Sequence, residues 1–179
     1  MVFLDVELTK KVIVSPDKFK GLNISFRKYL TIQLFAKLGR HKSSRKRGYF
    51  LSPMYINYAD DGQKNKRTNE YTFEVSFNCT TMKPCKGEIL IGIVYKITTD
   101  GIYLKSGPMQ NIFLSENKMK DYKFYIVEQL VFANPNRGGS IKIGTKVRFK
   151  VFKVEWIKSD GEFHIQATIE ANYLGPMSS

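Results

Sequence analysis

The sequence has few of the residues that build catalytic and metal centres. Only two of its 179 residues are cysteine and only two are histidine. Cys79 and Cys85 match no metal-ligand spacing, and no further Cys or His pair is available to complete a zinc site. We therefore expect two reduced, structural thiols, with no metal and no cofactor.

A catalytic constellation is missing as well. His41 lies in a basic segment and His164 on a predicted strand. A Cys85–His164 dyad is conceivable, but an inert thiol and a surface histidine are the simpler interpretation. No glycine-rich phosphate loop ending in Lys-Ser/Thr occurs. The sequence thus predicts a protein without enzymatic activity of its own.

Long apolar runs are absent too. No stretch approaches the roughly 20 residues that span a bilayer. Asp5 and Glu7 interrupt the apolar start of the chain, so we expect no signal peptide and no membrane contact.

Acidic residues are scarce beside basic ones. Lys and Arg outnumber Asp and Glu by 29 to 16, which gives a formal net charge of +13. Such an excess favours polyanionic partners, because a basic surface displaces counterions from phosphate backbones. A coat that only keeps the protein in solution is the alternative interpretation.

The first half predicts a small α+β unit. Residues 2–8 alternate between apolar and other residues, as a half-buried strand does. An apolar residue at every fourth position gives one helix face over about residues 23–38, which Gly39 ends. Strand signals return at residues 49–58, and residues 71–79 alternate again. We expect a helix on one face of an antiparallel sheet.

A basic segment, residues 41–47, follows the predicted helix. It suits a nuclear-import signal, a phosphate contact or a solvated loop, and the sequence does not choose among them.

The second half loses the helical period. Apolar residues alternate from Ile89 to Ile97, short strands are expected at residues 102–105 and 112–114, and residues 123–132 are expected to be extended. The apolar parity of residues 147–156 changes after Val151, which indicates a β-bulge. Residues 163–169 give the last alternating strand. Five or so short strands fit a Greek-key barrel of the oligonucleotide-binding type.

Candidate RNA-binding side chains lie on the predicted strands. If the apolar residues between them face the core, strand alternation places three cations outside: Lys146, Arg148 and Lys150. Neighbouring strands contribute further candidates: Tyr95, Tyr103, Lys105, Phe113 and His164. Aromatic rings stack on bases while cations hold the backbone of a single strand. The alternative is that Tyr95 and Phe113 belong to the core.

Three short motifs occur in an order that resembles one family. They are the stretch from Lys83 to Ile89, Gly107-Pro108-Met109 ahead of Ile112, and the terminal Asn172 to Gly175. With them, the chain resembles the seventh-largest subunit of eukaryotic RNA polymerase II, in a family that also has an archaeal RNA polymerase member. A first strand and a Pro-Phe element at residues 16–19 extend the resemblance to nearly the whole chain. The second and third motifs look more like the polymerase II member than the polymerase III one.

The resemblance implies a truncated ribonucleoprotein-like domain at residues 1–83 and an S1-type oligonucleotide-binding barrel at residues 84–179. It implies a non-catalytic stalk subunit in the nucleus. This subunit would form a heterodimer with the polymerase's fourth-largest subunit, dock on the polymerase core and meet single-stranded nascent RNA. Five RNA-binding candidates match strands of that barrel by position, and His164 on the last strand joins them: Tyr103, Lys105, Lys146, Arg148 and Lys150.

The chain also departs from the family. Cys85 stands where a Phe is usual, and Ile91 where a polar or acidic residue is. The glycine- and proline-bearing tip loop that docks on the core enzyme is replaced by residues 62–67. In this replacement Lys64, Lys66 and Arg67 are the core-docking candidates.

Two other functions remain open. A free-standing S1-type RNA-binding factor in translation or RNA decay would need the barrel, but it would leave the apolar surface of the first half unused. A small hydrolase on an oligonucleotide-binding barrel lacks any metal or nucleophile constellation.

Overall fold

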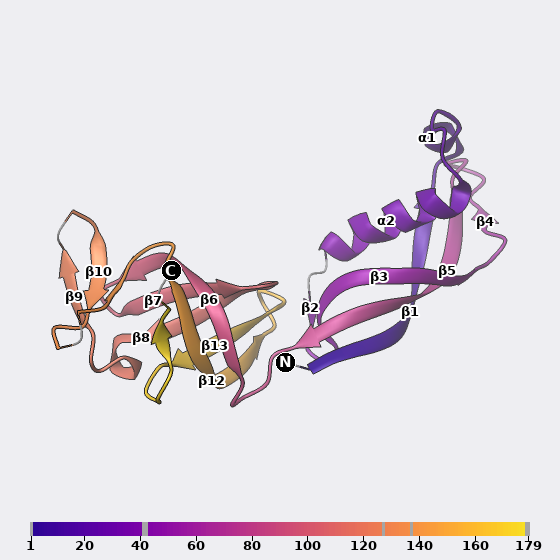
Figure 1. The fold of residues 1–179 in the computed structure, drawn as a ribbon. Helices are drawn as coiled ribbons and strands as arrows, with labels where there is room; N and C mark the ends of the chain where they lie inside the picture. Colours follow the sequence, from indigo (N-terminus) through magenta and orange to yellow (C-terminus); the bar gives the residue numbers. More distant parts are fainter. Residues whose placement is uncertain (1, 41–42, 127, 137, 178–179) are drawn as a thin grey trace. The chain divides into compact units, whose positions relative to one another are not determined.

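The chain folds as two compact units, Val2–Lys83 and Pro84–Ser179. The structure, a computed structural model, describes residues 2–40, 43–126, 128–136 and 138–177. The described chain is mostly β-structure with few helices (Figure 1). Neither α-helix within these ranges is long and apolar enough to cross a membrane.

The first unit is an antiparallel sheet with two helices between its first two long strands. The strand order is β1-β5-β3-β2, and β4 pairs with β5. The elements are β1 (Val2–Val14), α1 (Pro16–Lys20), α2 (Phe26–Arg40), β2 (Ser43–Ser44), β3 (Gly48–Ala59), β4 (Gln63–Lys64) and β5 (Tyr71–Lys83). The predicted order of strand, helix, strand and strand is confirmed, with two short strands added.

Helix α2 packs its apolar face on the sheet. Tyr29, Leu30, Leu34 and Leu38 are buried in one core with inward residues of β1 and β5, Cys79 among the latter. The predicted helix face is therefore confirmed at these four residues, whereas Phe26, which the four-residue spacing includes, is exposed. The predicted end is wrong, because α2 continues through Gly39 to Arg40. His41 and Lys42 of the basic segment lie outside the described residues.

The second unit is a barrel with a small separate sheet. Its elements are β6 (Ile89–Thr98), β7 (Gly101–Ser106), β8 (Met109–Ser115), a 3-10 turn η1 (Glu116–Lys118), β9 (Lys123–Ile126), β10 (Leu130–Ala133), β11 (Ser140–Ile141), β12 (Lys146–Ile157), β13 (Glu162–Thr168) and β14 (Gly175–Pro176). The strands β6, β7, β8, β13 and β12 pair in that order, and β12 pairs back with β6. Only β13 and β8 in this ring are parallel. The expected five-stranded barrel is confirmed.

Two features of the second unit differ from expectation. The segment 123–132 is not one extended stretch, because β9 and β10 pair antiparallel as a hairpin and β11 completes their sheet. The short strand β14, which was not predicted, pairs with β12 at Val147 and Arg148.

The barrel core follows the predicted parity of β12. Val147, Phe149 and Val151 are buried, and the pairing of β12 with β13 shifts between Val151 and Lys153. The predicted bulge is therefore confirmed. Phe152 is the extra residue of the bulge and is exposed, so the expectation that it shares the apolar face with Val154 and Trp156 is wrong. After the shift, Val154 and Trp156 lie opposite the buried Ile165 and Phe163.

The turn between β6 and β7 requires glycine. Gly101 has a φ of 151°, and a Cβ atom there would lie 2.3 Å from the carbonyl oxygen of Leu114. Any larger side chain would push β7 away from β8, so this glycine fixes the start of the β7–β8 pair.

Candidate nucleic-acid interface

Three cations form a stripe on the outer face of the barrel. Lys146, Arg148 and Lys150 alternate with buried residues of β12, as predicted. The edges of this part of β12 are covered by β6 on one side and β14 on the other. We call these three residues the basic stripe. It is a row of positive charge in the spacing of an extended strand, about 6–7 Å between neighbours.

An apolar strip lies directly beside the basic stripe. Opposite Lys150, Arg148 and Lys146 in the β6–β12 pair are three residues whose exposed fractions are 61%, 46% and 38%: Ile89, Ile91 and Ile93. We call them the isoleucine strip. Contiguous exposed apolar side chains of this kind mark interaction surfaces more often than isolated ones do.

The sequence did not reveal the isoleucine strip because β6 is apolar on both faces. The alternation from Ile89 to Ile97 is present, but the inward positions are Leu90 and Val94. A register shift between Val94 and Lys96 then reverses the parity, and Ile97 turns inward. The exposure of the strip follows from the pairing of β6 with β12, which places Ile91 on the same outer face as Arg148.

Aromatic side chains gather next to the strip. The ring centroids of Tyr95 and Tyr103 are 6.3 Å apart, and those of Tyr103 and Phe113 are 4.9 Å apart. The Nζ atom of Lys96 lies 5.2 Å from the centroid of Tyr103. We call Tyr95, Tyr103 and Phe113 the aromatic cluster. In this cluster, rings from adjacent strands lie next to one another, and the ammonium group of Lys96 lies over one of them.

Tyr95 is exposed, so its assignment to the core is wrong, whereas Phe113 is half-buried. The Tyr95 hydroxyl donates a hydrogen bond to the backbone oxygen of Gln110 at 3.0 Å. Partial burial, with a smaller contribution from Tyr103, raises the pKa of Tyr95. Its ring therefore remains neutral at physiological pH.

Lys105 links the aromatic cluster to the basic stripe. It lies opposite Ile93 in the β6–β7 pair, and Ile93 lies opposite Lys146 in the β6–β12 pair. Five of the six RNA-binding candidates therefore lie on one outer surface made by β7, β6 and β12. That surface is cationic at its edges and apolar or aromatic between them.

His164 is set apart from that surface. It lies on β13 opposite Glu155, beyond the bulge of β12, and its Nε2 is 2.9 Å from the carboxylate of Asp160. Nearby, Asn111 donates a hydrogen bond to Glu162 at 2.7 Å. The carboxylates of Asp160 and Glu162 therefore lie on this part of the barrel, and negative charge beside His164 disfavours a phosphate there.

The three core-docking candidates belong to the first unit. Lys64 ends the short strand β4, opposite Tyr71, with its Nζ atom 5.8 Å from the ring centroid. The turn that follows is ordered by a hydrogen bond of 2.9 Å from the backbone N–H of Arg67 to Oδ1 of Asn65. Lys64, Lys66 and Arg67 are all exposed at the tip of this hairpin.

Metal chemistry finds no support in the described part of the chain. No group of three or more His, Cys, Asp or Glu residues within it is arranged to hold a metal ion. The Cys79 thiol is buried in the core of the first unit, and Cys85 is half-buried.

Comparison with known proteins identifies the family. No protein-family model matches the chain. The DNA-directed RNA polymerase V subunit 7 of Arabidopsis thaliana is 30% identical over 177 residues, which cover 99% of each chain. The chain belongs to the subunit 7 family of DNA-directed RNA polymerases. The alignment spans both units, so the family resemblance is confirmed over the whole fold.

Within the subunit 7 family the similarity is uneven. The DNA-directed RNA polymerase IV subunit 7 of the same plant is 33% identical over 175 residues, covering 98% of this chain and 99% of its own length. Its DNA-directed RNA polymerase II subunit 7 is only 24% identical over 175 residues, 97% of this chain and 96% of its own. The leaning towards polymerase II is therefore not supported, and the polymerase IV and V type is more similar.

Proposed function

We propose that the chain is a non-catalytic stalk subunit of a nuclear DNA-dependent RNA polymerase. The observation that carries this proposal is the end-to-end similarity to a polymerase V subunit 7. The higher identities to polymerase IV and V subunits favour a polymerase of that type over polymerase II. In this assembly the chain forms a heterodimer with the fourth-largest subunit.

The two units have different tasks in this proposal. The unit Val2–Lys83 corresponds to a truncated ribonucleoprotein-like domain that docks on the polymerase core, with Lys64, Lys66 and Arg67 at the tip that makes contact. The unit Pro84–Ser179 corresponds to an S1-type barrel. Its ring has five strands, and β8 and β13, the third and fifth of them in chain order, form the one parallel pair. This is the Greek-key arrangement of oligonucleotide-binding barrels.

The barrel binds single-stranded nascent RNA on the surface made by β7, β6 and β12. Lys146, Arg148, Lys150 and Lys105 hold phosphates, while Tyr103 offers a ring face for stacking on a base. His164, among carboxylates, is left out of this surface. Such a surface has a modest affinity for RNA that depends little on base sequence, which suits a nascent transcript that moves along the protein as it is made.

The proposal is tested by purifying the tagged chain from its native cells and identifying its partners by mass spectrometry. We expect the largest polymerase subunits together with one small partner, and the identity of the largest subunit names the polymerase class. Recovery of ribosomal or RNA-decay proteins without any polymerase subunit would instead establish a free-standing RNA-binding factor.

A single substitution in the aromatic cluster tests the stacking role. Tyr103→Leu keeps an apolar side chain of similar bulk but removes the ring face and its contact with Lys96. Affinity for a short uridine oligonucleotide is expected to fall by about tenfold, since a stacked base contributes about 1–3 kcal/mol. Fluorescence anisotropy with a labelled oligonucleotide measures the affinity.

The matched control is Tyr125→Leu, which changes an exposed tyrosine of β9 and should bind as well as the unchanged protein. If the unchanged protein and both variants bind with equal affinity, Tyr103 is not part of the interface.

A further inference from the structure

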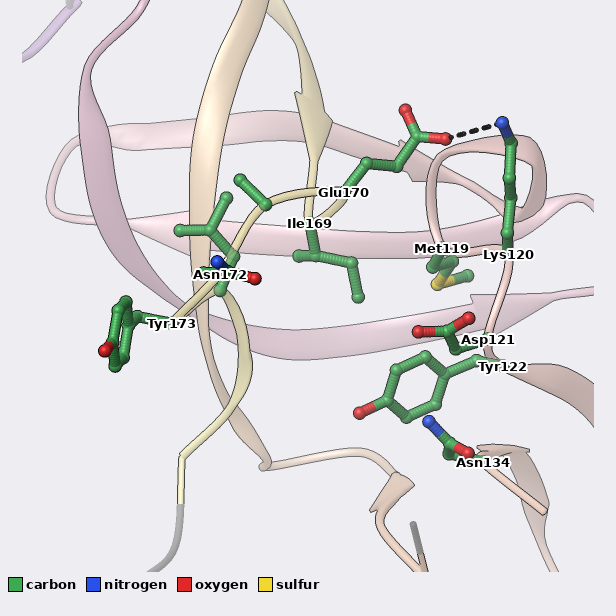
Figure 2. A pocket seen from close by; sticks show the side chains of 11 residues that line it. Met119, Lys120, Asp121, Tyr122, Asn134, Ile169, Glu170, Asn172 and Tyr173 are labelled. Atoms are coloured by element: carbon green, nitrogen blue, oxygen red, sulfur yellow. Dashed lines mark ion pairs between the residues drawn. The ribbon is translucent and has the colours of Figure 1, made fainter. Parts of the chain in front are cut away.

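A cavity in the described residues is separate from the proposed RNA surface. It has a volume of about 590 Å³ and belongs to the unit Pro84–Ser179. Its walls are the connection that follows η1, the buried Asn134, and the segment that follows β13 (Figure 2). None of its lining residues is in the basic stripe, the isoleucine strip or the aromatic cluster. The size is that of a pocket for a small organic group.

Polar groups converge on this cavity. Figure 2 shows the carboxylate of Asp121, the hydroxyl of Tyr122 and the amide of Asn172 directed towards the same space. The amide of Asn134 is fixed, because its Oδ1 accepts a hydrogen bond of 2.9 Å from the backbone N–H of Asn136. A few oriented polar groups around a cavity are what determine the specificity of a ligand site.

The two carboxylates at the cavity, Glu170 and Asp121, differ in their ion pairs. Glu170 is paired with Lys118 at 3.3 Å and with Lys120 at 3.2 Å. The hydrogen bond from Lys120 is the main reason that the pKa of Glu170 is lowered, so it stays ionised. Asp121 has no such ion pair with any residue in the described ranges, and it is exposed to the cavity. Its two oxygens are therefore available to a ligand.

One aromatic side chain of the lining, Tyr173, points away from the cavity and from Asp121 in Figure 2. Tyr173 is 91% exposed, and its φ of 65° is in the left-handed region that residues other than glycine seldom adopt. A hydrogen bond of 3.2 Å from the N–H of Leu174 to the oxygen of Ala171 closes the turn that holds it. A ring presented in this way offers its face to another flat group outside the cavity.

We infer that this cavity binds one guanine base of single-stranded RNA. The inference rests on the proposed RNA-binding function and adds a base-reading site to it. A phosphate is disfavoured beside Asp121, because no lysine in the described ranges offsets the charge of that carboxylate as Lys118 and Lys120 offset the charge of Glu170. A base fits instead, with its edge towards Asp121 and Asn172. The flanking phosphates then remain at the rim, where Lys120 is exposed.

Guanine is selected by the pattern of donors on its edge. Its N1–H and N2–H₂ groups are adjacent donors, and they match the two oxygens of one carboxylate. Uracil offers a single N–H between two carbonyl oxygens, and those oxygens would face the carboxylate unfavourably. A matched pair of hydrogen bonds makes the affinity for the correct base about tenfold or more higher than that for a wrong base.

The test compares two RNA oligonucleotides with the intact chain. One is a short uridine strand with a single central guanine, and the other has uridine at that position. We expect the guanine strand to bind about tenfold more tightly. Asp121→Asn, which keeps the shape but loses one acceptor, should bring the two affinities to within about twofold while leaving uridine binding unchanged. Asp100→Asn, which removes the same charge from the exposed β6–β7 turn, should keep the preference.

A second measurement separates this inference from the RNA function on which it rests. Guanosine and uridine monophosphates are titrated into the intact chain, and the side-chain amide signals of Asn134 and Asn172 are followed by NMR. Shifts with guanosine monophosphate alone support the pocket, even if neither oligonucleotide binds. The guanine site is overturned if both oligonucleotides bind the unchanged protein with equal affinity, or if saturating guanosine monophosphate causes no shifts. Equal but tight oligonucleotide binding would leave the proposed RNA function standing.

Discussion

Replacing Lys146, Arg148 and Lys150 together with glutamate is expected to lower the RNA affinity of the intact chain by about 10³-fold or more, since each of three hydrogen bonds to a charged group contributes about 1.5–3 kcal/mol. The three side chains face outward from a strand whose alternate residues are buried, so the change leaves the barrel core intact. It replaces three phosphate contacts with three repulsive charges. The substitutions lie in the second unit, so binding of the polymerase partner through the first unit should persist.

The salt dependence of binding provides a second readout of the same variant. Each phosphate contact on a single strand contributes about 0.7 to the slope of log affinity against log salt concentration. The loss of three contacts should reduce that slope by about two. A variant that lost affinity by misfolding would show no such ordered change, and circular dichroism checks that it is folded.

A matched control carries the same change of net charge elsewhere on the second unit. Lys123, Lys142 and Lys158 are exposed and lie off the surface made by β7, β6 and β12. Their joint replacement with glutamate should weaken binding only through the general loss of positive charge. If both triple variants lose the same affinity, or if the folded stripe variant binds as the unchanged protein does, the basic stripe is not the RNA-binding site.

The outer surface of β12 was predictable because the alternation of its residues is compatible with only one orientation of the strand. Large apolar residues alternate with cations, and burying lysine without a partner is costly. The bulge after Val151 was predictable for the same reason, since the apolar parity visibly changes there. The helix face from Tyr29 to Leu38 was recognisable from the spacing of its buried residues, although the exposed side of α2 also carries Ile32 and Phe35.

Strand β6 shows where that reasoning ends. Both of its faces are apolar, so hydrophobicity cannot say whether Ile91 or Leu90 faces the core. The orientation of β6 is determined by its pairing with β12. Arg148 lies on the outer face, and because Ile91 lies directly opposite it, Ile91 must lie on that face too. The departure noted at Ile91, where the family usually has a polar or acidic residue, is thus a change on the outside of the barrel.

The cavity near Asp121 was beyond prediction for a different reason. Its walls come from three segments that are separated in the chain and brought together by the pairing of β13 with β8 and by the docking of η1. A hydrogen bond of 3.2 Å from the N–H of Ile169 to the oxygen of Lys118 joins two of them. Spacing along a sequence contains no trace of such a contact. The motif from Asn172 to Gly175 was recognised only as a resemblance.

Stability measurements on two neighbouring phenylalanines are expected to differ sharply. Phe149→Ala should lower the free energy of unfolding of the barrel by about 3–5 kcal/mol, because the ring is fully buried and its removal leaves a cavity. This is a large share of the roughly 5–15 kcal/mol that stabilises an ordinary domain. Phe152→Ala, in the bulge itself, makes the same chemical change at a side chain that is 43% exposed. It loses its contact with the Nζ atom of Lys118, 4.7 Å from the ring centroid, and should cost about 1 kcal/mol or less.

Urea unfolding of the full chain can resolve this difference within the barrel alone. Trp156 is the only tryptophan in the sequence, and it lies on β12 with its ring 4.8 Å from that of Phe163. Its fluorescence therefore reports the second unit without a signal from the first. With a urea dependence of about 1–3 kcal/mol per molar, Phe149→Ala should lower the midpoint by about 2 M. Equal shifts for the two variants would mean that Phe152 is not the outward-facing extra residue of the bulge.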